Sequence, residues 1–309
     1  MARQLTKPFV QLMMSFGAVA LLFGLYLEVG TNWLEQSSQN ELVGELTGTP
    51  GADLDDATSG KVIEAGPALA GVQAGDPIGV FRIDPDDNQA GVDVRKVFVE
   101  GTDTGDLQKG PGHYTGFPFP GQPGNAPIAG HRVTYGAPFN AIDELVPGDR
   151  VKVTTSQGEA TYEVIPALTG APEDAPVPIE VGEAYWVTVP EDSSSLGDYG
   201  DDRLTMTACH PKHSDRYRII VQAKLVSPPT PGAVGQPAAE SPARTEIADP
   251  DTGWADNWRE LGLLSLLVFC NLVVVGYVGG MIGRWVWALR VADTALIGFV
   301  LWEVFQGLA

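Results

Sequence analysis

Two apolar runs, one near each end of the chain, most constrain what this sequence can fold into. Residues 9–29 carry no charge before Glu28, and the run from Leu261 to Ile282 has Asn271 as its only strongly polar residue. Each run is about 20 residues long, which as a helix is enough to cross roughly 30 Å of hydrocarbon. The sequence therefore predicts a transmembrane signal anchor at 9–29 and a second transmembrane helix at 259–283.

The charges that flank the two runs predict their orientation. They are Arg3 and Lys7 before the first run, Glu28 and Glu35 after it, and Arg284 and Arg290 after the second. Because positive charge is enriched on the cytoplasmic side, we expect both termini, 1–8 and the cytoplasmic or interfacial tail 284–309, inside the cell. The chain between the helices is then extracytoplasmic, held at the plasma membrane. A cleaved secretory signal is the alternative, but the only suitable tripeptide, 18–20, lies in the middle of the apolar run.

The middle of the chain is acidic and divides into three parts. The whole sequence has 39 acidic against 19 basic residues and a net charge of -20, which argues against a nucleic-acid partner because phosphates are neutralised by clustered Lys and Arg. Residues 30–75 are acidic and rich in small residues, and 227–258 are rich in Pro and Ala, so we expect both to be extended linkers. Residues 76–226 remain as one domain of ordinary size.

Seven short β-branched runs in that domain predict strands. They are 78–83, 92–101, 150–156, 160–168, 185–189, 203–209 and 217–226. Two other pieces, one following Asp106 and one at 137–145, look like short helices. The pattern favours a mainly β fold, a closed or nearly closed barrel of antiparallel type with about eight strands and one or two short helices, flanked by the transmembrane helices.

The domain contains a set of residues suited to thiol chemistry. Cys209 ends one predicted strand and precedes His210-Pro211, His131 ends the run that begins at Asn125, and Arg218 lies where the next strand could bring it back beside the sulfur. A nucleophile, an acid–base group and an oxyanion donor are what acyl transfer by a thiol needs. Taken singly, each has an ordinary explanation: a small buried residue, a histidine at a strand end and a surface charge.

Metal binding is the alternative use of these side chains. Cys209, His210 and His213, with His113 or His131, offer ligands for zinc, but their spacing matches no usual zinc motif. A calcium site could be suggested by Asp86, Asp87, Glu173 and Asp174, although solvated acidic loops are commoner. We expect no metal and no cofactor.

Several motifs in the same order resemble one known family. They are Ala-Gly-His-Arg-Val-Thr-Tyr-Gly-Ala-Pro-Phe at 129–139, Leu-Thr-Met-Thr-Ala-Cys-His-Pro at 204–211, Arg-Tyr-Arg at 216–218, Gly-Pro-Gly-His-Tyr at 110–114 and Leu-Val-Pro-Gly-Asp at 145–149. Together they resemble the sortases, specifically class E of Actinobacteria, over roughly residues 76–226.

The resemblance implies a sortase-type β-barrel and a membrane-anchored cysteine transpeptidase. It implies Cys209 as nucleophile, His131 as general acid and base, and Arg218 as oxyanion stabiliser. Arg216 is the alternative arginine, because alternate residues of one strand face the same side and either could reach the sulfur; the family position favours Arg218. The implied reaction cleaves a Leu-Ala-x-Thr-Gly or Leu-Pro-x-Thr-Gly sorting signal between Thr and Gly. A thioacyl intermediate then passes the secreted protein to an amine of a peptidoglycan precursor.

The same resemblance implies that Tyr135 helps to select alanine at the second position of the signal. Thr207, Ala208 and His210, which lie beside the predicted nucleophile in the sequence, are further candidates for substrate binding. One departure stands beside the nucleophile: the family's Thr-Leu-x-Thr-Cys is Thr-Met-Thr-Ala-Cys at 205–209, so Ala208 lacks a hydroxyl. Two other hypotheses stay open. One is an L,D-transpeptidase-like or peptidase activity, although the Ser-x-Gly-Cys signature is absent. The other is a non-catalytic module that binds sorting peptides.

Overall fold

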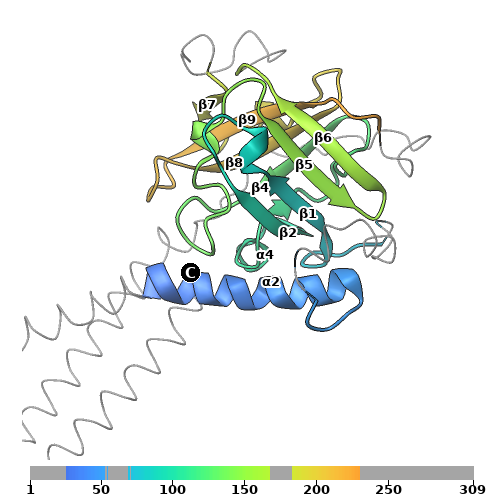
Figure 1. Ribbon diagram of the computed structural model, residues 1–309. Coiled ribbons are helices and arrows are strands. Elements are labelled where there is room, and N and C mark those ends of the chain that lie inside the picture. Colours follow the sequence, from blue (N-terminus) through green and yellow to red (C-terminus); the bar gives the residue numbers. More distant parts are fainter. Residues whose placement is uncertain (1–25, 53, 55–68, 70, 168–182, 230–309) are drawn as a thin grey trace, which may run out of the picture. The chain divides into compact units, whose positions relative to one another are not determined.

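The computed structural model describes residues 26–52, 54, 69, 71–167 and 183–229 (Figure 1). The chain divides into two units, Met1–Gly30 with Thr252–Ala309, and Thr31–Asp251. Within the described residues, no helix is both long enough and apolar enough to span a membrane. The predicted helix at 259–283, the tail 284–309 and residues 9–25 of the predicted anchor lie outside that part of the chain. The last residues of the anchor belong to a short π-helix, η1 (Tyr26–Gly30).

Nine strands form one sheet in the described part of the chain. They are β1 (Pro77–Ile83), β2 (Val94–Glu100), β3 (Gly112–His113), β4 (Asn125–Ala129), β5 (Arg150–Thr155), β6 (Gly158–Val164), β7 (Tyr185–Thr188), β8 (Arg203–His210) and β9 (Tyr217–Leu225). The seven predicted strands are confirmed as β1, β2, β5, β6, β7, β8 and β9. Two short strands, β3 and β4, are additional.

The sheet closes into a barrel, as the sequence predicts. Its strand order is β6-β5-β1-β2-β3-β4-β8-β9, and a further pairing of β6 with β9 joins the two ends, so eight strands form a ring. The β6 pairing uses the end of β9 around Leu225, while β7 pairs with the earlier part of the same edge. The expectation of an antiparallel barrel needs one correction, because β2–β3 and β4–β8 are parallel.

Helices are few and short around the barrel, as expected. They are α4 (Thr104–Leu107) and the 3-10 turns η3 (Pro85–Asp87), η4 (Ile142–Glu144) and η5 (Ser194–Leu196), with one longer helix, α2 (Thr31–Thr47). The helix predicted at 137–145 is reduced to η4, because Ala137 has a φ of 42° in the left-handed region, which cannot begin a right-handed helix. The helix expected after Asp106 is α4 instead, which begins before Asp106 and ends at Leu107.

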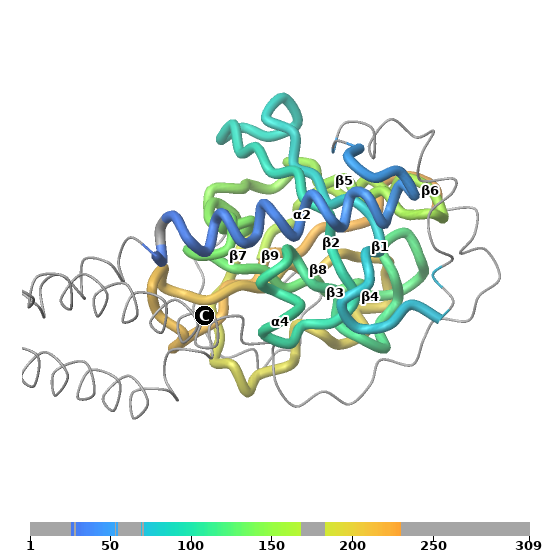
Figure 2. The backbone as a smooth tube through the Cα atoms, turned by 90° about the horizontal axis from the view of Figure 1, so that it is seen from below, coloured from blue at the N-terminus to red at the C-terminus, as the bar shows by residue number. Residues whose placement is uncertain are grey.

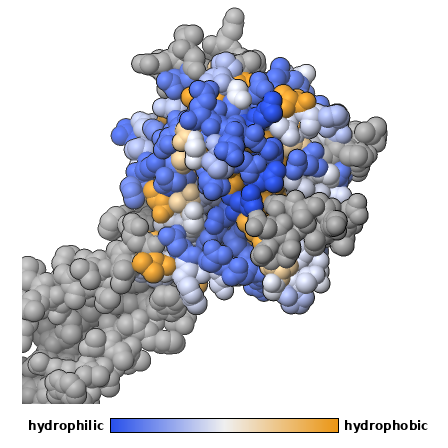
Figure 3. Space-filling view, viewed as in Figure 1, coloured by the Kyte–Doolittle hydropathy of each residue, from blue (hydrophilic) through white to orange (hydrophobic). Residues whose placement is uncertain are grey.

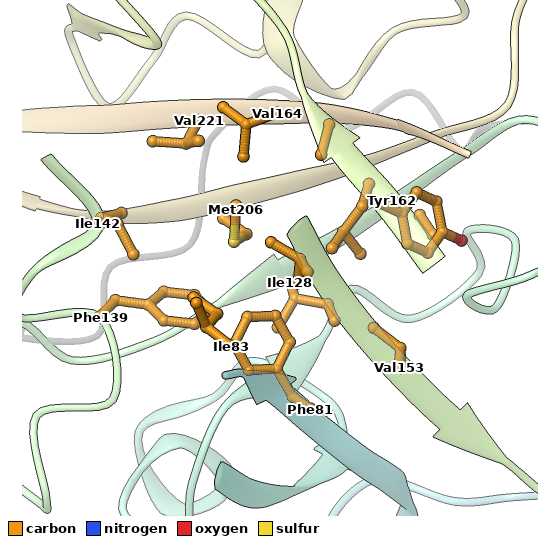
Figure 4. Close-up of a cluster of buried hydrophobic side chains, with 14 of the residues drawn as sticks. Phe81, Ile83, Ile128, Phe139, Ile142, Val153, Tyr162, Val164, Met206 and Val221 are labelled. Atoms are coloured by element: carbon orange, nitrogen blue, oxygen red, sulfur yellow. The ribbon is translucent and has the colours of Figure 1, made fainter. Parts of the chain in front are cut away.

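Alternation along the strands separates the barrel interior from its outer surface. The interior is filled by aromatic and aliphatic side chains that include Phe81, Phe139, Met206 and Val221 (Figure 4). Alternate residues such as Val97 and Ile220 face outward instead, into two smaller apolar clusters. The visible face in Figure 3 is largely hydrophilic with small separate hydrophobic spots, in keeping with the acidic composition.

The first of the two predicted linkers, 30–75, is not extended over its first part, because residues 31–47 form α2. This helix lies across β1 and β2 on the outside of the barrel (Figure 2). Leu42, Val43 and Leu46 pack against outward-facing valines of the two strands, among them Val80 and Val97. Burying these side chains stabilises the docked helix by on the order of 1.5–3 kcal/mol each.

Polar contacts complete the docking of α2. The amide of Gln39 accepts a hydrogen bond from the Val97 N–H (2.8 Å) and donates to the Val97 carbonyl (2.9 Å) and the Lys109 carbonyl (2.7 Å). Strand β3 pairs with β2 only at Val99 and Glu100, so it does not reach Val97. The Val97 N–H and carbonyl therefore form their hydrogen bonds with the Gln39 side chain instead of with β3. Truncating Gln39 would remove the hydrogen bonds that its side chain makes with the Val97 and Lys109 backbone, so this residue stabilises the docked helix.

Glu35 on α2 makes the docking sensitive to pH. Its carboxylate is 1% exposed and lies 2.7 Å from the Lys96 ammonium, and burial raises its pKa above the ordinary value of 4.5 although Lys96 opposes the shift. The folded protein therefore holds this proton more tightly than the unfolded chain. The contribution of Glu35 to the free energy of unfolding therefore falls as pH rises from the ordinary carboxyl range through the folded pKa, and then levels off.

We expect Glu35→Gln to remove that contribution to the pH slope. The measurement is denaturant unfolding of both proteins at steps between about pH 4 and 8, a window that spans the carboxyl range and the levelling above it. Glu41→Gln is the matched control, because Glu41 is an exposed carboxylate on the same helix. Identical slopes in wild type and Glu35→Gln would contradict the assignment.

Candidate active site

Three adjacent strands bring the predicted catalytic residues to one end of the barrel. Strand β8 lies between β4 and β9, and Ala129 on β4 is the parallel partner of Thr207 on β8. The Gly130 N–H donates to the Thr207 carbonyl (3.1 Å), so the alignment continues past the end of β4. His131 and Cys209 each lie two residues beyond the Ala129–Thr207 pair, and parallel strands carry them to the same rim.

Cys209 is paired directly with Arg218 across the β8–β9 ladder. Side chains of directly opposed residues leave the same face of a sheet, with Cβ atoms typically about 5 Å apart. The thiol therefore has the guanidinium on one side and the histidine-bearing strand on the other. All three side chains are buried, with Cys209 and His131 each 1% exposed and Arg218 fully covered.

The structure separates the two candidate arginines. Arg218 lies within β9, and its Nη1 donates to the carbonyls of Asp215 (2.6 Å) and Tyr217 (3.1 Å), which fix the guanidinium. Arg216 precedes the strand, is exposed, and holds its guanidinium 5.1 Å from the ring centre of Tyr217. The alternation argument that kept both arginines open fails because β9 begins only at Tyr217.

The ring of His131 is oriented by a neighbour that the sequence analysis did not identify. Thr134 Oγ1 lies 3.2 Å from His131 Nδ1, within hydrogen-bond distance. This contact orients the imidazole, with Nδ1 toward Thr134 and Nε2 on the opposite edge of the ring. The His131 carbonyl also accepts from the Phe139 N–H (3.0 Å). No pattern in the sequence signals this role, because a threonine three residues after a histidine is common.

The loop after His131 is braced by its own side chains. Asn140 donates through Nδ2 to the Arg132 carbonyl (2.6 Å), and Arg132 Nη2 donates to the Asn140 carbonyl (3.1 Å) and pairs with Asp143 Oδ1 (2.9 Å). Before the histidine, Gly130 is required for packing, because a Cβ there would lie 2.8 Å from the Phe139 ring. These contacts hold the loop as one unit against the barrel.

Strand alternation places the predicted substrate residues Thr207 and Ala208 on opposite faces. Thr207 shares the outer face with Cys209, and its hydroxyl is bonded to the Tyr114 hydroxyl (2.8 Å). Ala208 lies with Met206 in the barrel interior. The Ala208 side chain therefore lies in the core beneath the nucleophile, and substrate binding at Ala208 stays a prediction.

The remaining predicted contacts, His210 and Tyr135, lie on either side of the site. His210 follows the nucleophile, and burial and the charge of Arg132 lower its pKa, with Asp143 opposing, so the surroundings favour the neutral ring. Tyr135 is 1% exposed, and its ring centre lies 5.1 Å from that of His131. Tyr135 therefore packs against the histidine in this structure.

The other titratable residues considered for metal binding are engaged elsewhere or lie apart. His113 Nδ1 lies 2.7 Å from Glu100 Oε2, and its Nε2 donates to the Pro118 carbonyl (3.0 Å). Asp87 forms an ion pair with Lys152, while Glu173 and Asp174 lie outside the described residues. Over the described ranges, no group of three or more His, Cys, Asp or Glu side chains is placed to hold a metal ion.

Comparison with known proteins identifies the barrel. The family model described as "Sortase domain" matches residues 90–226. Among curated proteins, the chain is 36% identical over 117 residues to sortase SrtE1 of Streptomyces coelicolor, covering 38% of this chain and 30% of that protein. It is 43% identical over 67 residues to sortase D of Bacillus subtilis, covering 22% and 32%.

Solved structures include sortase E from Streptomyces avermitilis, at 33% identity and a TM-score of 0.39, covering 54% of this chain and 98% of that one. The chain spans less than a third of the length of the two curated relatives in these matches. The matched region nevertheless contains the strands that carry Cys209, His131 and Arg218. The chain therefore belongs to the sortase family of transpeptidases, and within that family it is similar to the class E members.

Proposed function

We propose that this protein cleaves a Leu-Ala-x-Thr-Gly or Leu-Pro-x-Thr-Gly sorting signal between Thr and Gly and transfers the cleaved protein to an amine. The observation that carries the proposal is the strand register, which aligns Cys209 with Arg218 on one side and with the end of the His131 strand on the other. A thiol between a cation and an imidazole has the groups that acyl transfer requires.

In the first half of the reaction, the Cys209 thiolate attacks the carbonyl carbon of the threonine. Negative charge develops on the carbonyl oxygen, and the Arg218 guanidinium, held by two backbone carbonyls, stabilises it as a charged donor. The carbon–nitrogen bond then breaks, and the leaving glycine amine takes a proton from the His131 imidazolium. The product is a thioester between the threonine of the substrate protein and Cys209.

In the second half, an amine replaces the thiol. His131, now neutral, accepts a proton from the incoming amine as that nitrogen attacks the thioester carbonyl, and Arg218 again stabilises the oxyanion. The carbon–sulfur bond breaks and Cys209 leaves as thiolate. The imidazolium and thiolate are regenerated, so proton and charge balance over the cycle.

The same proposal includes the partners and the location. The substrates are secreted proteins with a C-terminal sorting signal, and the acceptor is an amine of a peptidoglycan precursor. The two apolar runs at 9–29 and 259–283 support a protein anchored in the lipid bilayer, with the barrel on the extracytoplasmic side and both termini in the cytoplasm. An enzyme held there would meet its substrates as they leave the membrane.

Mass spectrometry of the full chain in detergent tests the chemistry directly. The protein is incubated with a Leu-Ala-x-Thr-Gly peptide, and in parallel with a Leu-Pro-x-Thr-Gly peptide, with and without a glycine-like or diaminopimelate amine. We expect an acyl adduct on the tryptic peptide containing Cys209 when no amine is present. With the amine present, we expect a ligated product and loss of the adduct.

Two outcomes would contradict the proposal. Peptide binding without an adduct, in a protein whose Cys209 still reacts with iodoacetamide, would indicate a module that binds sorting signals without cleaving them. Hydrolysis of the peptide with no transfer to either amine would indicate a peptidase. The ratio of the two peptides' kcat/KM values reports the preference at the second position of the signal.

A further inference from the structure

The N-terminal helix α2 contacts the loop that carries the catalytic histidine. At the start of the helix, Thr31 Oγ1 accepts a hydrogen bond from the Tyr135 N–H (3.3 Å), and Asn32 Oδ1 accepts one from the Gly136 N–H (2.9 Å). Both donors belong to the loop that begins at His131. Two consecutive backbone amides of an active-site loop are thus held by an element far away in the sequence.

The loop conformation needs such support. Tyr135, Gly136 and Ala137 have φ values of 49°, 71° and 42°, three successive residues in the left-handed region. For Tyr135 and Ala137 this region costs of order 1 kcal/mol or more each, so surrounding contacts must maintain it. The hydrogen bonds from α2 end on two of these three residues.

The fit between helix and loop is close. A Cβ built at Gly136 would lie 2.6 Å from Glu35 Oε2, so the carboxylate occupies the space that any other residue's side chain would need. Lys96 of β2 pairs with the same carboxylate (2.7 Å) and fixes it in place. One turn further along, Gln39 anchors the helix to β2, so the start of α2 has little freedom to move away from the loop.

The contact between α2 and the loop reaches the catalytic site through the residues that orient the His131 ring. The ring of Tyr135, whose backbone is held by Thr31, packs on the His131 ring at 5.1 Å with an interplanar angle of 37°. Thr134, the preceding residue, lies at hydrogen-bond distance from His131 Nδ1. Displacing the loop backbone by even an ångström would therefore move both groups that orient the imidazole, and misplacement of that size can cost about 10²-fold in rate.

We propose that Thr31 and Asn32 are positioning residues for His131, acting through the Tyr135–Gly136 backbone. The inference rests on the transpeptidation proposed above. The helix that follows the predicted membrane anchor is then a working part of the active site, although it lies on the outside of the barrel and touches no reacting atom. Its removal would leave the barrel with all three catalytic side chains and a misplaced acid–base group.

The test compares matched variants of the full chain in the peptide ligation assay. We expect Asn32→Ala to lower kcat by about tenfold with KM changed less than threefold, and Thr31→Val together with Asn32→Ala to lower kcat further, toward the 10²-fold that misplacement can cost. The pH profile of kcat/KM, which reports the essential acid and base, should change shape in the same variants. Asn32→Asp and Thr31→Ser keep the acceptor oxygens and should restore most of the activity.

Asn40→Ala is the control, because Asn40 is an exposed asparagine on the same helix that contacts only Gln36 among the side-chain hydrogen bonds described. It should leave kcat and the pH profile unchanged. Wild-type kcat in Asn32→Ala and in the double variant would overturn the inference, and so would an increase in kcat, which would show that α2 restrains the loop. A wild-type protein that ligates no peptide would instead contradict the proposed function, so the two failures are distinguishable.

Discussion

Replacing Cys209 by alanine is expected to abolish both the acyl adduct and ligation, with a fall in kcat of about four orders of magnitude or more. Every step of the proposed reaction passes through the sulfur, and removal of a nucleophile in a covalent mechanism removes the whole pathway. The loss would be chemical, because removing one buried sulfur atom costs roughly 1 kcal/mol of stability. Ligation kinetics and thermal unfolding on the same sample separate the two effects.

The second cysteine supplies the control. Cys270 lies in the second apolar run of the sequence, and Cys270→Ala should ligate at the wild-type rate. Ligation by Cys209→Ala at more than about one per cent of the wild-type rate, far above what loss of a covalent nucleophile allows, would show that another group is the nucleophile.

Arg218→Lys should also lose most activity, by about 10² to 10³-fold in kcat, although the positive charge is kept. The guanidinium uses Nη1 to donate to two carbonyls while its planar fork presents further N–H groups in fixed directions. A lysine ammonium is a compact charge on a flexible stem and cannot make both sets of contacts. An oxyanion donor is worth this order of magnitude in related acyl-transfer chemistry. KM should change much less than kcat, because the oxyanion exists only in the transition state and intermediates.

Arg216→Lys is the matched control for that variant. Arg216 is exposed beside Tyr217, two residues from Arg218, so it tests the same substitution outside the site. We expect less than a twofold change in kcat. A silent Arg218→Lys combined with a damaging Arg216→Lys would show that the exposed arginine moves into the site when substrate binds.

The strands of this barrel were predictable because hydrophobic and β-branched residues repeat along them. Those in β1, β2, β5, β8 and β9 fill the interior and form recognisable runs. Strand β3 has no such signal, because its two residues, Gly112 and His113, are strand only through their pairing with β2 and β4. Pairing partners distant in sequence decide such elements, and a local pattern does not report them.

Helix α2 escaped prediction because its buried face is largely polar. The side chains that it buries are Thr31, Glu35, Gln39, Leu42, Val43, Leu46 and Thr47, which follow helical spacing but include apolar residues only in the second half. A search for an apolar stripe therefore finds no helix in the first half. The partners that make these polar groups favourable, such as Lys96 and the Val97 backbone, lie on a strand remote in sequence.

The three residues of the candidate site could be chosen from the sequence, but their surroundings could not. Strand ends and the family motifs indicate Cys209, His131 and Arg218, whereas the register of β8 decides that Thr207 shares the thiol's face and Ala208 does not. A one-residue difference in register reverses the face of every side chain, so substrate contacts adjacent to a nucleophile depend on information that the motif lacks.

The closing strand of the barrel also determines when the three site residues can come together during folding. Strand β9 contributes Arg218 to the site and, through the pairing of Leu225 with Tyr162, joins the sheet into a ring. During synthesis from the N-terminus, β4 and the following His131 emerge before the β8–β9 hairpin that supplies the thiol and the guanidinium. Until that hairpin pairs with β4, a nascent chain therefore has His131 without the two groups beside which it lies in the folded barrel. Docking of the β8–β9 hairpin thus closes the barrel and completes the site in the same step.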